Sequence, residues 1–340
     1  MKDIREVGRI LGVRYVLEGS VRKVGNRVRL TAQLIDGLDG RHLWADRFDG
    51  DLNDVFDLQD RITQEIVAAL EVRMALGEQG RVWRKRSGSP LVYEHFLKGR
   101  SLYFNFARHT HAQARSELGC ALEINPVFTP ALVILGYTLT DQARFGWEQD
   151  RAATYEAALT CAARALTADP SCGEAYTVIG YVRIFQRCHE EAVAAGEKAI
   201  SLSPSGTYAY HMAAMYHGYA GDFQRAVLYE EQAQRLSPIE LSVSMVDEAR
   251  ARFHLNDFNT ARNIALRVLN ARPRWLTAKT TLIAALWNLG NENDARAIAR
   301  EILAGHPDFS VSRWARGLPY RHQEHLDALT QPLRLAGLPK

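Results

Sequence analysis

Alternation of apolar and polar residues marks the first part of the chain, between residues 14 and 48. Val28, Leu30 and Leu34 fall on one face of an extended segment. Arg29 and Gln33 fall on the other face, which gives the two-residue period of a half-buried strand. A Gly-Asn and an Asp-Gly dipeptide interrupt the alternation, and both favour tight hairpin turns. The pattern therefore predicts three antiparallel strands, at about 14–24, 27–36 and 41–48.

A helical period replaces the alternation after this predicted sheet. Apolar residues recur at intervals of three and four and form a stripe that can cover the sheet: Val55, Leu58, Ile62, Ile66 and Leu70. A shorter helix is predicted before Gly12. We therefore expect a small α+β domain over residues 1–76, followed by a polar, basic linker over residues 77–90.

From residue 91 onward the apolar pattern is helical and repeats itself. Prolines recur with spacings of 44, 34, 34, 35 and 34 residues, at Pro126, Pro170, Pro204, Pro238, Pro273 and Pro307. An alanine stands twelve positions before each proline: Ala114, Ala158, Ala192, Ala226, Ala261 and Ala295. A small residue lets two helices approach closely, and a proline ends one helix and opens the next unit. The alanines are therefore the predicted packing positions of a helical repeat.

This register of alanine and proline resembles the tetratricopeptide repeat (TPR), a helix–turn–helix unit of about 34 residues. The resemblance implies an α-solenoid of six helix pairs within residues 91–305, at about 91–124, 127–168, 171–202, 205–236, 239–271 and 274–305. A helical cap is expected over residues 306–340, because the last unit of a solenoid must cover its exposed face. A pentatricopeptide array, which reads RNA, is the alternative, and it would prefer a strict 35-residue period. The expected fold class is mainly α, with the α+β domain in front.

The stretch TYAYHMAAMYHGYA is predicted to be the first helix of the fourth unit. First helices line the groove of a TPR array, and the resemblance places these residues there: Tyr137, Tyr181, Phe185, Tyr208, His211, Met215, Tyr219, Phe253 and Trp287. Lysines and asparagines that would grip a terminal carboxylate are absent from the corresponding positions. An aromatic groove with few charges suits an apolar or helical peptide. The expected partner is a protein or peptide, including an effector domain of the same polypeptide, and a homodimer is left open.

Histidines raise the question of a metal site. His211 and His217 are six residues apart, so on one helix they point to different faces and cannot act as an i, i+4 pair of ligands. His109 and His111 are interpreted as solvated residues of the first intra-unit turn. The sequence therefore predicts no metal and no cofactor.

Composition narrows the classes of function. The net charge of +3 on 340 residues is too nearly balanced to indicate a nucleic-acid partner. The start of the chain is charged and does not resemble a signal peptide, and the longest apolar stretch, residues 127–140, is too short to span a bilayer. Four cysteines without metal-ligand spacing indicate free thiols in a reducing compartment. We therefore expect a cytoplasmic protein with no membrane segment in this chain.

Three stretches of the first domain carry a second resemblance: RYVLEGSVRKVGNRVRLTAQLID, HLWADRFD and DVFDLQDRITQEIVAAL. Together they resemble the TolB amino-terminal-like domain, which is also seen in FlgO-like proteins. That domain followed by TPRs, with an RFGW insert and the tail HLDALTQPLRLAGLP, looks like the C-terminal half of bacterial class III adenylate cyclases. The resemblance also fits the same region of a winged-helix transcriptional regulator, and a free-standing TPR scaffold is a third interpretation.

Two departures from that family shape the expectations. The family's domain begins with a further strand, helix and strand, so the resemblance implies that Met1 is an internal or truncated start. Three strands alone would leave an unpaired edge. No stretch resembles a cyclase catalytic domain, and no phosphate-binding glycine motif or hydrolase motif is found. The chain is therefore expected to be no enzyme, but the regulatory and protein-interaction region of a cyclase-type signalling protein.

Overall fold

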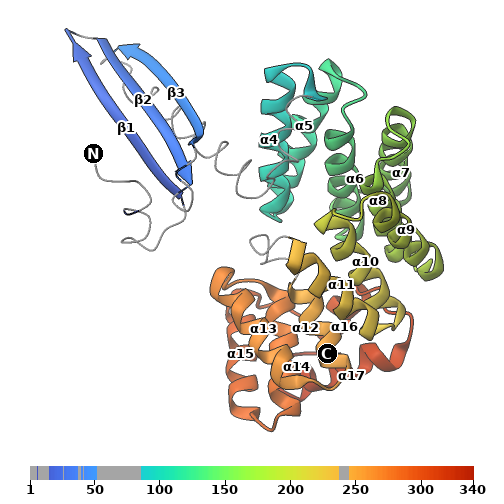
Figure 1. Cartoon of the computed structure of the whole chain (residues 1–340). Helices are drawn as coiled ribbons and strands as arrows, with labels where there is room; N and C mark the ends of the chain where they lie inside the picture. Colours follow the sequence, from blue (N-terminus) through green and yellow to red (C-terminus); the bar gives the residue numbers. More distant parts are fainter. Residues whose placement is uncertain are drawn as a thin grey trace. The chain divides into compact units, whose positions relative to one another are not determined.

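The structure is a computed structural model (Figure 1), and it describes residues 6, 15–25, 27–36, 40, 42–51, 86–236 and 245–340. The chain divides into two compact units, Met1–Lys85 and Arg86–Lys340. The helix expected over residues 54–77 lies outside the described residues, as does the helix expected before Gly12 apart from Glu6. The domain limits at residues 76, 90 and 305 stay predictions.

The first unit contains a three-stranded antiparallel sheet with the strand order β1-β2-β3. The strands are β1 (Tyr15–Val24), β2 (Arg27–Asp36) and β3 (His42–Asp51). Ala32 of β2 packs against Phe48 of β3 on one face, as the alternation predicts. The register between β2 and β3 shifts between Leu34 and Ile35, because β3 has an extra residue there, and both Leu34 and Ile35 are buried. The predicted hairpins are confirmed, and β3 ends three residues later than predicted because its last residues stay paired with the start of β2.

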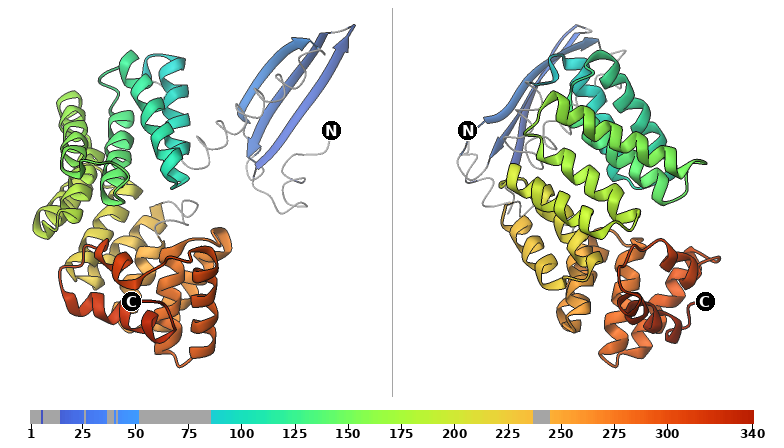
Figure 2. Two further views of the ribbon diagram at one scale, coloured as in Figure 1. Left: turned by 180° about the vertical axis from the view of Figure 1, so that it is seen from behind. Right: turned by 90° about the vertical axis from the view of Figure 1, so that its right-hand side faces the viewer.

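The second unit consists of paired helices, and Figure 2 shows these pairs from two further sides. The described residues contain fourteen helices: α4 (Pro90–Phe104), α5 (Arg108–Ile124), α6 (Thr129–Arg144), α7 (Arg151–Ala168), α8 (Gly173–Phe185), α9 (His189–Leu202), α10 (Thr207–Ala220), α11 (Phe223–Leu236), α12 (Met245–His254), α13 (Phe258–Ala271), α14 (Leu276–Asn288), α15 (Glu292–Gly305), α16 (Val311–Arg316) and α17 (Gln323–Leu335). The first twelve form the six pairs of a TPR-like array, which confirms the predicted fold class.

Each helix pair closes through one residue in the left-handed backbone region. These residues are Phe106, Gly146, Arg187, Gly221, Asn256 and Gly290. Glycine and asparagine tolerate this conformation, whereas most other side chains avoid it. At Arg187 the conformation is therefore held by surrounding contacts, which are described below.

Small residues set the spacing between the helices. The six alanines at the predicted packing positions, Ala114, Ala158, Ala192, Ala226, Ala261 and Ala295, are at most 3% exposed. Gly180 of α8 lies so close to α10 that a Cβ atom there would sit 2.8 Å from Cζ of Tyr216. These close approaches bring successive first helices together and thereby align the side chains of the candidate site.

Candidate functional site

Aromatic side chains of the first helices form a continuous row across four helix pairs, which we call the aromatic row. Its rings come from α4, α6, α8 and α10. The centroid distances are 6.1 Å for Tyr103–Tyr137, 6.0 Å for Tyr137–Tyr181, 5.2 Å for Tyr137–Tyr208, 5.4 Å for Tyr181–Phe185 and 6.4 Å for Phe185–Tyr219. Sequence analysis missed Tyr103. It stands 34 positions before Tyr137, but the proline at the start of its unit, Pro90, is 36 residues before Pro126 and falls within the predicted linker.

The residues predicted for the groove differ in how far they are exposed. Tyr137, Tyr181, His211, Met215, Tyr219 and Phe253 are buried, and Phe185, Tyr208 and Trp287 are half-buried. Phe253 lies next to Phe258, and Trp287 packs on the C-terminal core. Neither has a ring contact with the row among the described residues. A role of these residues in binding a partner stays a prediction.

A buried carboxylate, that of Asp141 on α6, contacts the aromatic row through Tyr181. It accepts a hydrogen bond from the Tyr181 hydroxyl at 2.6 Å and one from Nε2 of His111 at 3.3 Å, and it forms an ion pair with Arg144 at 2.8 Å. Burial alone would raise the pKa of Asp141, but the Arg144 charge and the two hydrogen bonds outweigh it and lower the pKa. Asp141 is therefore held ionised inside the array.

His111 differs from the sequence expectation. It was predicted to be a solvated turn residue, but its side chain is 0% exposed. The reason is that α5 already begins at Arg108, so His111 lies in the first helical turn and faces α6. Its Nδ1 lies 3.2 Å from the carbonyl oxygen of Ala107. His109 is exposed, as expected.

The loop between α16 and α17 docks on the turn between α8 and α9. Arg187 donates to the carbonyl oxygens of Tyr320 at 3.0 Å and Leu318 at 3.3 Å. Nε2 of His189 donates to the carbonyl oxygen of Pro319 at 2.7 Å. These bonds satisfy three consecutive backbone carbonyls, and they fix the left-handed turn at Arg187.

The Tyr320 side chain covers one end of the aromatic row. Its ring lies 5.2 Å from that of Tyr219, and the backbone amide of Arg321 donates to the Tyr219 carbonyl oxygen at 2.9 Å. The Tyr219 hydroxyl in turn accepts a hydrogen bond from Arg250 at 2.6 Å. A segment of the chain itself therefore occupies this part of the row.

Acidification should loosen this docked loop, because His254 beside it is held neutral. Burial, followed by the charges of His325 and Arg250, lowers the pKa of His254 to about 3. Its Nε2 hydrogen-bonds to the Tyr320 hydroxyl at 2.8 Å, and its ring stacks on Phe223. Between pH 6.5 and 3 the unfolded chain binds the extra proton, so stability falls as the pH is lowered. The melting temperature should fall more steeply over this range in the wild type than in His254→Gln, and equal slopes would contradict the assignment.

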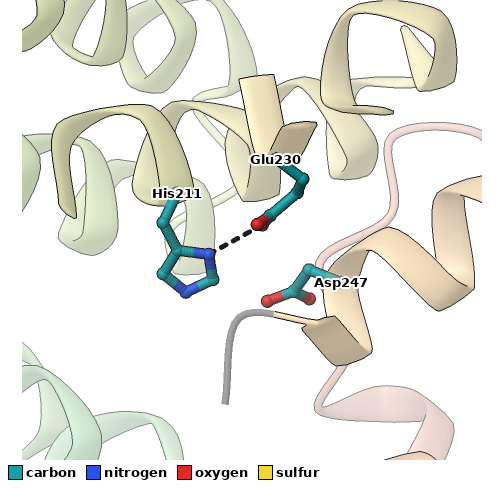
Figure 3. Close-up of side chains that lie close together, drawn as sticks. All are labelled: His211, Glu230 and Asp247. Carbon is teal, nitrogen blue, oxygen red and sulfur yellow. Dashed lines mark hydrogen bonds and ion pairs between the residues drawn. The ribbon is translucent and has the colours of Figure 1, made fainter. Parts of the chain in front are cut away.

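Three ligand-type side chains from consecutive helices point toward one another, as Figure 3 shows: His211 of α10, Glu230 of α11 and Asp247 of α12. One possible ligand atom from each lies within 4.8 Å of the others. Nδ1 of His211 donates to Oε1 of Glu230 at 2.7 Å. We call these residues the His–Glu–Asp cluster.

Glu230 is the most unusual member of the His–Glu–Asp cluster. Its side chain is 0% exposed, and Oε2 accepts no hydrogen bond from any described residue. Burial raises the pKa of Glu230 to about 7, against the opposing effect of His211, and the nearby carboxylates Asp247 and Glu248 raise it further. No local pattern in the sequence indicates this cluster, because its three residues lie on three different helices.

His217 belongs to a different environment. Its Nε2 lies 2.9 Å from Oε1 of Glu197 on α9, and its Nδ1 lies 3.6 Å from Asp222. These two acids approach opposite nitrogens of the ring, so they cannot share one ion with it. The two histidines of α10 thus have separate partners.

The fold is a TPR-like array of helix pairs, and an antiparallel sheet precedes it in the chain. A 140-residue stretch, 41% of this chain, is 44% identical to "Putative adenylate cyclase 3" of Rhizobium meliloti (strain 1021) and spans 24% of that protein. The chain is therefore partly homologous to an adenylate cyclase-like protein. A comparison with protein-family models finds no match.

Three solved structures, two of them of TPR proteins, are similar at low sequence identity. A thermophilic TPR protein from Thermus thermophilus is 17% identical, with a TM-score of 0.46 over 58% of this chain and 99% of that one. PilF of Pseudomonas aeruginosa is 16% identical, with a TM-score of 0.46 over 64% and 93% of the two chains. A TPR protein from Parabacteroides merdae is 14% identical, with a TM-score of 0.41 over 72% and 99%. In the described part of the chain, every helix is too short or too polar to cross a membrane.

Proposed function

We propose that the chain is the non-catalytic regulatory and protein-interaction region of a bacterial adenylate cyclase-type signalling protein. The observation that carries this proposal is the 44% identity over 140 residues to the Rhizobium meliloti protein. Identity that high over that length indicates common ancestry, and with it a related role. Because the match spans only 24% of the relative, the activity in its name enters here as part of the proposal.

The lack of catalytic motifs supports a regulatory role. The sequence contains no stretch that resembles a cyclase catalytic domain and no glycine motif for binding nucleotide phosphates. The buried ionisable groups of the array, such as Asp141 and Arg144, are engaged with one another. In the proposed parent protein, the catalytic step therefore belongs to another domain.

The array is proposed to bind a peptide or a segment of its own polypeptide along the aromatic row. Tyr208 and Phe185 are half-buried members of that row, and amphipathic aromatic surfaces suit apolar or helical segments. The docking of Tyr320 on Tyr219 supports this proposal, because a non-helical loop of the same chain already uses the row's end.

A reconstitution experiment tests the proposed function. The chain is purified and mixed with the part of the Rhizobium meliloti relative that lies outside the match. Cyclic AMP formation from ATP is measured with Mg²⁺ and with Mn²⁺. We expect no activity from the chain alone. We also expect the rate of the mixture to differ from that of the partner alone by about fivefold or more, the lower end of allosteric coupling.

Two variants separate binding through the row from a nonspecific effect. Tyr208→Ala should weaken the change in rate, whereas Leu228→Ala should not, because Leu228 is 61% exposed on α11 and is outside the row. Cyclic AMP formation by the chain alone would contradict the non-catalytic assignment. An unchanged rate in the mixture, without co-elution of the two parts, would contradict the regulatory one.

A further inference from the structure

We propose that His211, Glu230 and Asp247 form a binding site for one divalent transition-metal ion, with Zn²⁺ as the best-fitting representative. The proposal rests on the geometry of the His–Glu–Asp cluster and is independent of the proposed function. Three helices each contribute one donor, and the donor atoms lie within 4.8 Å of one another.

The donor set fits a transition metal better than magnesium. An imidazole nitrogen with two carboxylate oxygens is a donor set that Zn²⁺ accepts, whereas Mg²⁺ prefers oxygen donors and keeps its own waters. Zn–N and Zn–O bonds of about 2.0–2.2 Å place tetrahedral ligand atoms roughly 3.3 Å apart. Nδ1 of His211 and Oε1 of Glu230 are 2.7 Å apart and the three donor atoms lie within 4.8 Å of one another, so an ion would separate the first two slightly and draw the more distant donors together.

Glu230 provides the independent observation that a ligand belongs in the cluster. A buried carboxylate oxygen without a hydrogen bond is costly, and Oε2 of Glu230 accepts none from the described residues. Figure 3 shows the Glu230 carboxylate beside the His211 ring, with the Asp247 side chain on the neighbouring helix directed toward this pair. An ion that the Glu230 carboxylate holds through both of its oxygens would satisfy this atom as well.

The described arginines near the cluster pair with Asp247 and Glu248, and they do not pair with Glu230. Arg250 pairs with Oδ1 of Asp247, and Arg252 pairs with Glu248 at 3.4 Å. Among the described residues, the His211 ring is the group that pairs with Glu230 and can balance its negative charge. Either a proton on that ring or a divalent ion does so, and the ion would replace the proton that Nδ1 of His211 shares with Glu230.

Such an ion would link the fourth helix pair to the fifth. Its ligands come from both helices of the pair α10–α11 and from the first helix of the next pair. In a solenoid each repeat contacts only its neighbours, so an ion at one junction stiffens the array there. Occupancy would then couple metal concentration to the shape of the aromatic row, which includes Tyr208 of the same helix.

Calorimetric titration of the untagged chain tests the site. After dialysis against a chelator, the chain is titrated with ZnCl₂ and separately with MgCl₂. We expect one Zn²⁺ per chain, no saturable binding of Mg²⁺ at the same concentrations, and proton release on binding, because the shared proton must leave. Zinc affinity should therefore rise as the pH increases.

Conservative variants identify the ligands. Glu230→Gln and Asp247→Asn keep side-chain size but remove a charged donor, and each should weaken zinc binding by at least about tenfold. Glu197→Gln is the matched control, because it alters the other histidine–glutamate contact of α10, and it should leave zinc binding unchanged. Circular dichroism in the presence of chelator verifies that the variants are folded. If Glu230→Gln does not fold, the zinc affinity of Asp247→Asn alone tests the site.

Three results would overturn the proposal. The wild type could fail to saturate with zinc, which would mean that the cluster is only a buried hydrogen-bonded pair with a neighbouring acid. Both variants could retain wild-type affinity, which would place the bound ion elsewhere. Glu197→Gln could abolish binding, which would assign the ion to His217 instead.

Discussion

Replacing Asp141 with asparagine should lower the free energy of unfolding of the helical unit by about 3–5 kcal/mol. The amide would keep the shape of the side chain, so no cavity forms. The loss arises because the Arg144 guanidinium and the His111 ring would remain beside a neutral group inside the array. Breaking a buried ion pair from one side leaves an uncompensated charge. Urea denaturation followed by circular dichroism measures the difference.

The control is an acid-to-amide change in an exposed ion pair within one helix. Glu292 pairs with Arg296 at 2.7 Å on the surface of α15, and Glu292→Gln should cost about 0.5 kcal/mol or less. The effect at Asp141 should also depend on pH. Because its pKa is lowered in the folded chain, its contribution is present above about pH 4 and is lost as the pH falls further. Equal costs for the two variants would mean that the Asp141 network does not stabilise the array.

Replacing Gly180 with alanine should cost about 3 kcal/mol, although alanine is the better helix former. The new Cβ would lie 2.8 Å from Cζ of Tyr216 and 3.1 Å from the carbonyl oxygen of Ala192. Tyr216 has no room to move away, because its ring is 0% exposed and its hydroxyl donates to the Thr177 carbonyl oxygen. Either α8 and α10 separate or a buried ring leaves its position. The midpoint of urea denaturation should therefore shift to lower concentration.

The same substitution at Gly119 should change the free energy of unfolding in the opposite direction. Gly119 lies within α5, and a Cβ there meets nothing within 4 Å. Gly119→Ala should therefore stabilise the chain by about 0.5–1 kcal/mol through helix propensity and reduced freedom of the unfolded chain. If both alanine variants are more stable than the wild type, α8 and α10 do not lie as close together as described.

Much of the fold could be predicted because it follows from short repeating patterns of apolar and small residues in the sequence. The two-residue alternation around Leu30 and Leu34 predicted the hairpins, since a sheet with one buried face requires it. The proline and alanine register predicted six helix pairs, and the predicted first helix of the fourth unit, residues 207–220, coincides with α10. Even Tyr103 was within reach, by counting one repeat back from Tyr137.

The candidate site was much less predictable, because its contacts join residues whose separation in sequence has no fixed period. Asp141 meets Tyr181 forty positions later, whereas Tyr320 meets Tyr219 across a hundred and one positions. Burial of His111 depended on where α5 begins, and helix ends are set within one or two residues by local capping. Helical spacing alone could test His211 only against residues on its own helix.

The sequence by itself determined the class of each segment, the length of the repeat and the small residues at which helices cross. Those features follow from backbone geometry and recur every 34 or so residues. The tertiary structure alone decided which polar groups share an environment. It brought Glu230 and Asp247 to His211, and it laid the loop that carries Tyr320 on the aromatic row. The physical reason is that these encounters depend on the angle and offset between whole helices, which no local pattern of residues records.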